Sequence, residues 1–212
     1  MMRVKNVAGV TLAVALFIVI GYIFYEALKP PVPVVIQAGH EGRTCGNTGA
    51  VCQGETEVAW NIVVADAAAA QLRQWGVEVL RVPADTSMVR ADIAVAVHFD
   101  SAQRVCRSGA SVGYPDTNAS RRFAQRWKAL YKPLFPFGWH EDNFTENLKD
   151  YYAYATIRAD KFLVLELGEL TCDAQRRWLK PRLTYLGRLI AYAIAKERGM
   201  DVTQPTPVSE KR

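Results

Sequence analysis

Several absences narrow the functions open to this chain of 212 residues. No run of five or more Lys or Arg occurs although the net charge is +5, and such scattered charges argue against a nucleic-acid partner. No two cysteines have the C-x-x-C spacing, which argues against a zinc site built from thiolates. No internal repeat is visible, so one ordinary domain with appendages accounts for the length.

The N-terminal stretch carries no charge over a length that could span a membrane. Residues 6–25 carry no charged side chain and follow the basic residues Arg3 and Lys5. At about 1.5 Å per residue, a helix of this length spans about the 30 Å hydrocarbon core of a bilayer. Positive residues stay on the cytoplasmic side, so the chain after Lys29 is predicted to lie outside.

A cleaved signal peptide is the alternative interpretation of this stretch. Its apolar region would usually be shorter, and no Ala-x-Ala site precedes Pro30. We therefore predict a membrane anchor at 1–28, and secretion if it is cleaved. A proline-rich spacer at 29–33 would join it to a domain at 34–199, and the polar tail at 200–212 is predicted to be disordered.

The four cysteines all follow this segment, in a compartment that we expect to be oxidising. Four cysteines permit three pairings. Cys45 and Cys52 bracket one short loop, which favours the pairs Cys45–Cys52 and Cys106–Cys172. Reduced, buried cysteines are the alternative.

Hydrophobic periodicity predicts alternating strands and helices. The predicted strands are 34–40, 77–82, 93–98, 109–114, 151–155 and 161–166, and the predicted helices are 57–76, 118–131, a short one from 173, and 183–196. Gly76 is placed as a helix C-cap. This order favours a single α/β sandwich, with a twisted, mostly parallel or mixed sheet of about six strands and helices on both faces.

Polar side chains follow or end three of these apolar strands. His40 comes after the first, His98 ends the third, and Glu166 ends a late strand. Glu57 opens the first long helix and reaches the same rim if that helix packs back along the sheet. Two imidazoles and a carboxylate are common protein ligands of catalytic zinc, and a second carboxylate could serve as general base.

Each of these residues also has a plain interpretation. His40 could cap a loop, and His98 could be a satisfied core histidine. Glu57 could favour the dipole of its helix, and Glu166 could form an ordinary salt bridge. Taken one at a time, these plain interpretations prevail.

Five short motifs that occur in a fixed order favour a functional interpretation of these residues. They are a strand running into Ala-Gly-His-Glu-Gly at 38–42, a helix from Glu57 ending at Gly-Val-Glu-Val at 76–79, Ala-Asp-Ile-Ala-Val-Ala-Val-His-Phe-Asp-Ser at 91–101, Gly-Ala-Ser-Val-Gly-Tyr at 109–114, and Leu-Val-Leu-Glu-Leu-Gly-Glu-Leu at 163–170. Together they resemble the zinc-dependent N-acetylmuramoyl-L-alanine amidases (amidase type 3), which cleave bacterial peptidoglycan. The resemblance covers about residues 34–197.

The resemblance implies a Zn²⁺ cofactor, a peptidoglycan substrate and a site in the cell envelope or periplasm. Carried over by position, His40, Glu57 and His98 would be zinc ligands and Glu166 the catalytic acid/base. Glu55 competes with Glu57, although the distance from Glu57 to Gly76 fits the helix of the family better. We expect a monomer.

Two further residues stay open as candidates. Glu169 competes with Glu166 but follows the predicted strand end. His140, the third histidine of the chain, could be a ligand, and we favour a substrate contact or an exposed position.

Two departures from the family pattern keep other functions open. Glu41 replaces a usual glycine after His40, and Asp100 stands where asparagine is usual. They motivate a catalytically inactive domain that binds the wall or a protein partner. Another alternative is a zinc peptidase that cuts the stem peptide itself.

Overall fold

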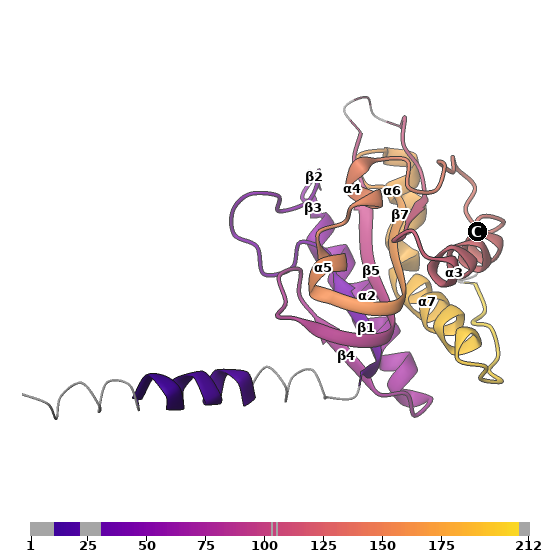
Figure 1. Cartoon of the computed structure of the whole chain (residues 1–212). Coiled ribbons are helices and arrows are strands. Elements are labelled where there is room, and N and C mark those ends of the chain that lie inside the picture. The colour runs from indigo at the N-terminus through magenta and orange to yellow at the C-terminus, as the bar shows by residue number, and fades with distance from the viewer. Residues whose placement is uncertain (1–10, 22–30, 103, 105, 208–212) are drawn as a thin grey trace, which may run out of the picture. The chain divides into compact units, whose positions relative to one another are not determined.

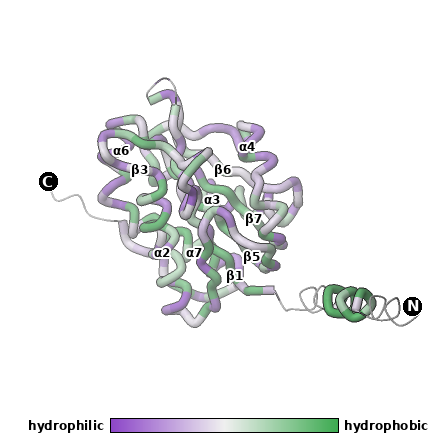
Figure 2. Tube along the Cα trace, turned by 90° about the vertical axis from the view of Figure 1, so that its left-hand side faces the viewer, coloured by the Kyte–Doolittle hydropathy of each residue, from purple (hydrophilic) through white to green (hydrophobic). Residues whose placement is uncertain are grey.

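A computed structural model of the protein describes residues 11–21, 31–102, 104 and 106–207. The chain divides into two units, Met1–Pro31 and Val32–Arg212. In the first unit, residues 11–21 are helical and mostly hydrophobic (Figure 2). Within the described ranges, no helix is long and apolar enough to cross a membrane.

Three predictions concern segments that lie partly outside the described residues. Residues 1–10 and 22–28 of the predicted anchor lie outside the described residues, as do the first two residues of the spacer. Of the predicted tail, residues 200–207 have neither helix nor strand, and 208–212 lie outside the described residues. Anchor, spacer and tail therefore stay predictions.

The second unit is organised around a five-stranded sheet in the order β4-β1-β5-β7-β6. The first four of these strands are parallel, and β6 pairs antiparallel with β7. The strands are β1 (Val32–Ala38), β4 (Val79–Val82), β5 (Val89–Asp100), β6 (Ser111–Gly113) and β7 (Ile157–Glu169). A separate two-residue hairpin consists of β2 (Val51–Cys52) and β3 (Glu55–Thr56).

Helices cover both faces of the sheet, as predicted (Figure 1). One face carries the long helices α2 (Glu57–Gln74), α3 (Asn118–Tyr131) and α7 (Leu183–Glu197). The other carries α4 (Glu146–Lys149) and α5 (Ala153–Thr156). The short α6 (Asp173–Leu179) and the 3-10 turn η1 (Lys180–Arg182) connect β7 to α7.

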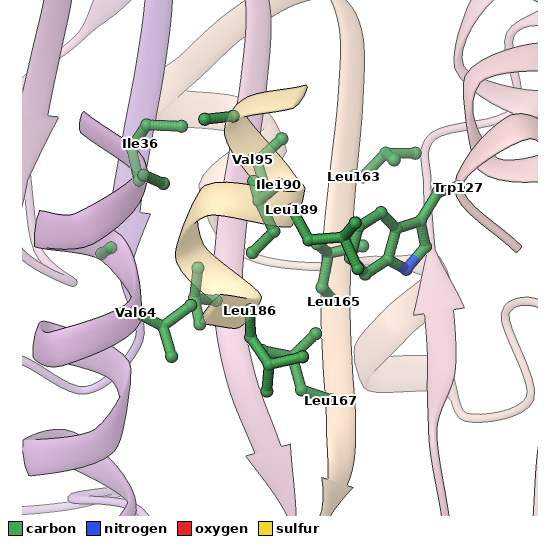
Figure 3. Close-up of a cluster of buried hydrophobic side chains, with 14 of the residues drawn as sticks. Ile36, Val64, Val95, Trp127, Leu163, Leu165, Leu167, Leu186, Leu189 and Ile190 are labelled. Atoms are coloured by element: carbon green, nitrogen blue, oxygen red, sulfur yellow. The ribbon is translucent and has the colours of Figure 1, made fainter. Parts of the chain in front are cut away.

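The main core lies between the sheet and the long helices. Leu186 and Ile190 of α7 pack among side chains of α2 and of the central strands, such as Val64 and Val95 (Figure 3). Each is at most 1% exposed, and full burial of such a side chain contributes about 1.5–3 kcal/mol. A Cβ on Gly187 would lie 2.4 Å from the carbonyl oxygen of Val64, so glycine there lets α7 approach α2 closely.

Local signals set both ends of α2. The Thr56 side chain accepts a hydrogen bond from the Ala59 backbone N–H at 3.2 Å, as an N-cap should. Gly76 follows the helix with φ +78°, a conformation that glycine adopts at low cost. The predicted start of this helix and its glycine stop are confirmed.

The predicted strand at 151–155 is wrong. These residues belong to a tight turn and α5, which is why the sheet has five strands and not six. Alternation of Tyr and Ala imitates a half-buried strand, but the three tyrosine hydroxyls have separate partners. Tyr151 bonds to His98, Tyr152 to the carbonyl of Ala84, and Tyr154 to the carbonyl of Leu148. Tyr151 and Tyr152 precede α5, and their hydroxyls lie 3.4 Å apart, whereas successive side chains of a strand point to opposite faces.

Two strands extend beyond their predicted ends. His98 pairs in register with Glu166, and β5 and β7 continue to Asp100 and Glu169. Glu166 therefore lies inside a strand and not at its end. The pairing shifts register between His98 and Asp100, and Gly168 has φ +144°, so the strands continue through an irregular step that apolar patterning does not reveal.

One of the two predicted disulfides is formed. Cys106 and Cys172 are bonded and join the loop after β5 to the start of α6. The pairing of Cys45 with Cys52 is wrong, because both are free thiols. The Cys52 sulfur instead accepts a hydrogen bond from Arg176 at 3.2 Å. This bond joins the β2–β3 hairpin to α6.

We expect Cys172→Ser to lower the free energy of unfolding by about 2–4 kcal/mol, since the disulfide closes a loop with a sequence separation of 66 residues. Urea denaturation measures this change. The matched control is Cys45→Ser, which removes an exposed free thiol and should shift the free energy by less than about 0.5 kcal/mol. Equal destabilisation by both substitutions would contradict the assigned pairing.

Candidate metal centre

His40, Glu57 and His98 meet at one end of the sheet. Their ligand atoms all lie within 4.8 Å of one another, and each residue is at most 7% exposed. Glu57 Oε1 lies 3.2 Å from His40 Nε2 and 3.0 Å from His98 Nδ1. The two imidazole rings are nearly perpendicular, with centroids 4.8 Å apart. The structure thus brings together the three residues singled out as zinc ligands.

The turn after β1 determines how close the histidines come. His40 has φ +62°, an uncommon conformation for a residue with a side chain. Gly39 donates its backbone N–H to the carbonyl of Val97 at 3.0 Å, which ties the turn to β5. A Cβ on Gly39 would lie 2.1 Å from His98 Cε1, so this position requires glycine.

Glu57 is held by more than the histidines. Its Oε2 accepts from the Ala50 backbone N–H at 2.9 Å, and its Oε1 is 3.3 Å from both Asn61 Nδ2 and the Phe99 backbone N–H. Asn61 lies one helical turn further along α2 and also donates to the carbonyl of Gly39 at 3.0 Å. The carboxylate therefore keeps one orientation.

Hydrogen bonds at the outer nitrogens assign the proton of each neutral ring. His40 Nδ1 is 2.9 Å from the carbonyl oxygen of Asn47, which can only accept, so Nδ1 carries the hydrogen. His98 Nε2 is 2.9 Å from the Tyr151 hydroxyl, which donates to Gln37 Oε1 at 2.9 Å and so accepts from Nε2–H. The inner nitrogens, His40 Nε2 and His98 Nδ1, then present lone pairs.

Two nitrogen lone pairs and a carboxylate oxygen at these distances repel one another unless a cation or protons lie among them. Imidazole nitrogens with a carboxylate, each histidine fixed through its other nitrogen, are the donor set and surroundings that suit Zn²⁺. The residues present therefore fit the metal that the sequence resemblance implied.

The electrostatics of the cluster follow from burial and from Glu57. Burial lowers the pKa of His98, which keeps that ring neutral. Burial also acts to lower the pKa of His40, but the protonated ring would donate to Glu57 and to the Asn47 carbonyl and be attracted by the Glu57 charge, and together these contacts raise the pKa. At Glu57 burial acts to raise the pKa, but the two imidazoles, which donate to the carboxylate and attract it when they are protonated, hold the pKa well below the ordinary value.

Glu166 lies beside the cluster on the neighbouring strand, in register with His98. Its Oε2 is buried and has no hydrogen-bond partner among the described residues. Burial, with the charges of Glu57 and Asp100 nearby, raises its pKa well above the usual range. A carboxyl group that can hold a proton at neutral pH is suited to general acid and base chemistry.

A cavity of about 310 Å³ opens onto these groups. His40, His98 and Glu166 line it. Its other walls are polar and aromatic and come mainly from α4, the turn into α5 and the loop after β1: Arg43, Asn47, Asp100, Phe144, Thr145, Asn147, Leu148, Asp150, Tyr151, Tyr152 and Val164.

The competing glutamates make contacts elsewhere. Glu55 accepts from Trp60 Nε1 at 3.0 Å and pairs with Lys180, so it is not part of the cluster. Glu169 is fully buried and accepts the backbone N–H groups of Cys106 and Ser108 at 2.9 and 2.7 Å, which ties down the loop after β5. Its contacts are those of a structural carboxylate.

The third histidine is also separate from the cluster. The His140 ring stacks on Phe144 with centroids 4.5 Å apart, and its Nε2 is 3.3 Å from the Ser108 hydroxyl. Ser108 also donates to Asp100. His140 therefore lies near the cavity wall, through Phe144 and Asp100, and a substrate contact there stays a prediction.

The two departures from the family pattern have different surroundings. Glu41 pairs with Arg81 of β4 at 2.6 Å and is not among the residues that line the cavity. Asp100 lines the cavity, and burial raises its pKa.

Sequence reasoning missed the residues that orient the cluster. These are Gln37, Asn47, Asn61 and Tyr151. Asn61 had a detectable signal in the sequence, because it stands four residues after Glu57 on a predicted helix. In the structure it is fully buried. Gln37 interrupts an apolar strand, which is also a detectable signal. Asn47 acts through its backbone, and Tyr151 had been assigned to a strand.

Comparisons with solved structures find proteins of similar fold. The catalytic domain of CwlV, an N-acetylmuramoyl-L-alanine amidase from Bacillus (Paenibacillus) polymyxa var. colistinus, is similar in fold, with TM-score 0.61, 20% identity and coverage of 79% of this chain and 98% of that one. AmiC2 of Nostoc punctiforme is similar with TM-score 0.56 and 20% identity, over 78% of this chain and 94% of that one. Ami1 from Mycobacterium smegmatis is similar with TM-score 0.60 and 15% identity, over 80% of this chain and 97% of that one.

No family model and no curated protein matches the chain. The structural comparisons nevertheless confirm the sequence resemblance at the level of fold. Residues of the second unit have the fold of N-acetylmuramoyl-L-alanine amidases.

Metal binding at this cluster is expected to weaken as the pH falls from 8 to 6. Ligation needs neutral imidazoles, and the raised pKa of His40 means that protons compete already above the ordinary value of about 6.5. Competition with a chromophoric chelator at several pH values measures the affinity for Zn²⁺. His140→Ala, which changes a histidine outside the cluster, should retain the wild-type profile, and an affinity independent of pH would contradict the ligand set.

Proposed function

We propose that this protein is a zinc-dependent hydrolase that cleaves the amide between N-acetylmuramic acid and L-alanine in peptidoglycan. His40, Glu57 and His98 would hold the metal, and Glu166 would act as the catalytic acid/base. The observation that carries the proposal is the convergence of three buried side chains that can bind a metal, beside the Glu166 carboxyl group on the adjacent strand. Its Oε2 has no hydrogen-bond partner among the described residues. The amidase fold supports the choice of substrate.

The chemistry is divided between the metal and the chain. Zn²⁺ at such a site acidifies water and polarises a carbonyl group. Glu166 would take the proton of the attacking water as it adds to the amide carbon, and would then pass that proton to the leaving amine of L-alanine. The surroundings that raise its pKa support the second transfer, because they favour the protonated carboxyl group.

The walls of the cavity suit a polar substrate. Arg43 stands on one side, hydrogen-bonded to Asp85 and stacked on the ring of Tyr152 at 4.6 Å. Asn147 and Asp150 stand on the α4 side and can hydrogen-bond sugar and peptide groups. A substrate in the wall places the domain in the cell envelope, and the sequence of residues 1–28 supports tethering there.

A non-enzymatic role in wall or partner binding is the alternative. Its motivation was the pair of departures at Glu41 and Asp100. Glu41 pairs with Arg81 and does not line the cavity, so we favour the enzyme. Incubation of the zinc-loaded protein with muropeptides, with and without chelator, separates the two. Chelator-insensitive cleavage, or intact muropeptides, would refute the hydrolase, and product masses distinguish an amidase from a stem-peptide peptidase.

We expect Glu166→Gln to reduce the rate of muropeptide cleavage by about 10²–10⁴-fold while zinc content stays at the wild-type level, because general acid–base catalysis contributes about that much. Rate and bound zinc are measured on the same preparation. Glu55→Gln is the control, since it removes a carboxylate that lies outside the cluster. Full activity of Glu166→Gln would reject its assigned role.

A further inference from the structure

The Tyr151 hydroxyl reaches the candidate metal centre from the opposite side of the molecule to α2. Tyr151 stands in the turn between α4 and α5, on the thinner covering layer, and is 8% exposed. Its hydroxyl oxygen lies 2.9 Å from His98 Nε2, and its ring meets the His98 ring edge to face, with centroids 5.5 Å apart.

A buried glutamine gives these contacts a direction. Gln37 is fully buried on β1, and its Nε2 donates to the carbonyl oxygen of Ala84 at 2.8 Å. That bond identifies the other side-chain atom as Oε1, which accepts from the Tyr151 hydroxyl at 2.9 Å. The hydroxyl hydrogen is therefore engaged with Gln37, and its oxygen is left to accept from His98 Nε2–H.

We propose that Tyr151 and Gln37 are positioning residues that hold His98 in the Nε2–H tautomer with Nδ1 toward Glu57. The order of donation runs from His98 to Tyr151, then to Gln37, then to the carbonyl of Ala84. The reverse order is not available, because a carbonyl oxygen cannot donate. The inference rests on the proposed function only in that the site binds Zn²⁺.

This series of hydrogen bonds from His98 through Tyr151 and Gln37 to Ala84, here called the relay, also connects the α4–α5 layer to the metal. Whatever favours the Tyr151–His98 contact favours ligation through Nδ1, and bound metal must favour the contact in return. Zn²⁺ should therefore stabilise the segment around Tyr151, although none of the three ligands belongs to it.

A neighbouring tyrosine offers a matched control. Tyr154 is in the same segment, and its hydroxyl donates to the carbonyl of Leu148 at 2.9 Å, a bond of the same length as that of Tyr151. Tyr154→Phe therefore removes an equivalent hydroxyl from α5 without touching His98. A purely structural role predicts similar effects of the two substitutions, and the relay predicts different ones.

The experiment titrates the full chain with Zn²⁺ in competition with a chromophoric chelator. We expect Tyr151→Phe to weaken zinc affinity by about 10–100-fold, as loss of a hydrogen bond to the outer nitrogen of a ligating histidine does, and Tyr154→Phe to retain wild-type affinity. Gln37→Met, which removes the acceptor of the Tyr151 hydroxyl, should also weaken binding. Equal affinity of wild type, Tyr151→Phe and Gln37→Met would overturn the relay.

Two further readouts separate positioning from folding. In zinc-loaded wild type at pH 8, the ¹⁵N shifts of His98 should show a hydrogen on Nε2 and ligation through Nδ1, and ligation through Nε2 would refute the proposal even if no variant folds. Zn²⁺ should slow amide exchange around Tyr151 in wild type and much less in Tyr151→Phe. Failure of wild type to bind Zn²⁺ would reject the proposed function, whereas binding that is indifferent to Tyr151 and Gln37 would reject the relay alone.

Discussion

The shared Glu57 carboxylate oxygen is the constraint around which the site is built. It lies within 3.2 Å of one nitrogen from each histidine, at the buried start of α2. Three electron-rich atoms can be held so close only if the chain supplies hydrogen-bond partners behind them and leaves room for positive charge between them. The Asn47 carbonyl, the Asn61 amide and the Tyr151 hydroxyl provide that support from three different elements.

The parallel sheet makes this arrangement possible. β1 and β5 are adjacent, so the turn after β1 meets His98, and β5 and β7 are adjacent and in register, so Glu166 lies beside it. Helix α2 returns along the main core face and presents its first residue to the same edge. The strand order thus assembles three candidate metal ligands and a neighbouring carboxylate from four elements, while each element follows ordinary packing rules.

Much of the fold was predictable because it depends on local regularity. Hydrophobic periodicity and the Gly76 stop located α2, and periodicity also located α3 and α7. The errors occurred where local pattern and tertiary contacts disagree. Residues 151–155 were predicted as a strand, but the hydroxyls of Tyr151 and Tyr152 lie 3.4 Å apart. Cys52 accepts a hydrogen bond from Arg176 and does not pair with Cys45.

The sequence by itself determined the α/β class, the order of the elements and the identity of His40, Glu57, His98 and Glu166 as a group. It could do so because strand and helix periods are local, and because these polar residues stand next to apolar runs. Only the tertiary structure decided which glutamate faces the histidines, which cysteines pair, and that Tyr151 supports His98. Those outcomes depend on distances between residues far apart in the chain, which packing sets and no local pattern encodes.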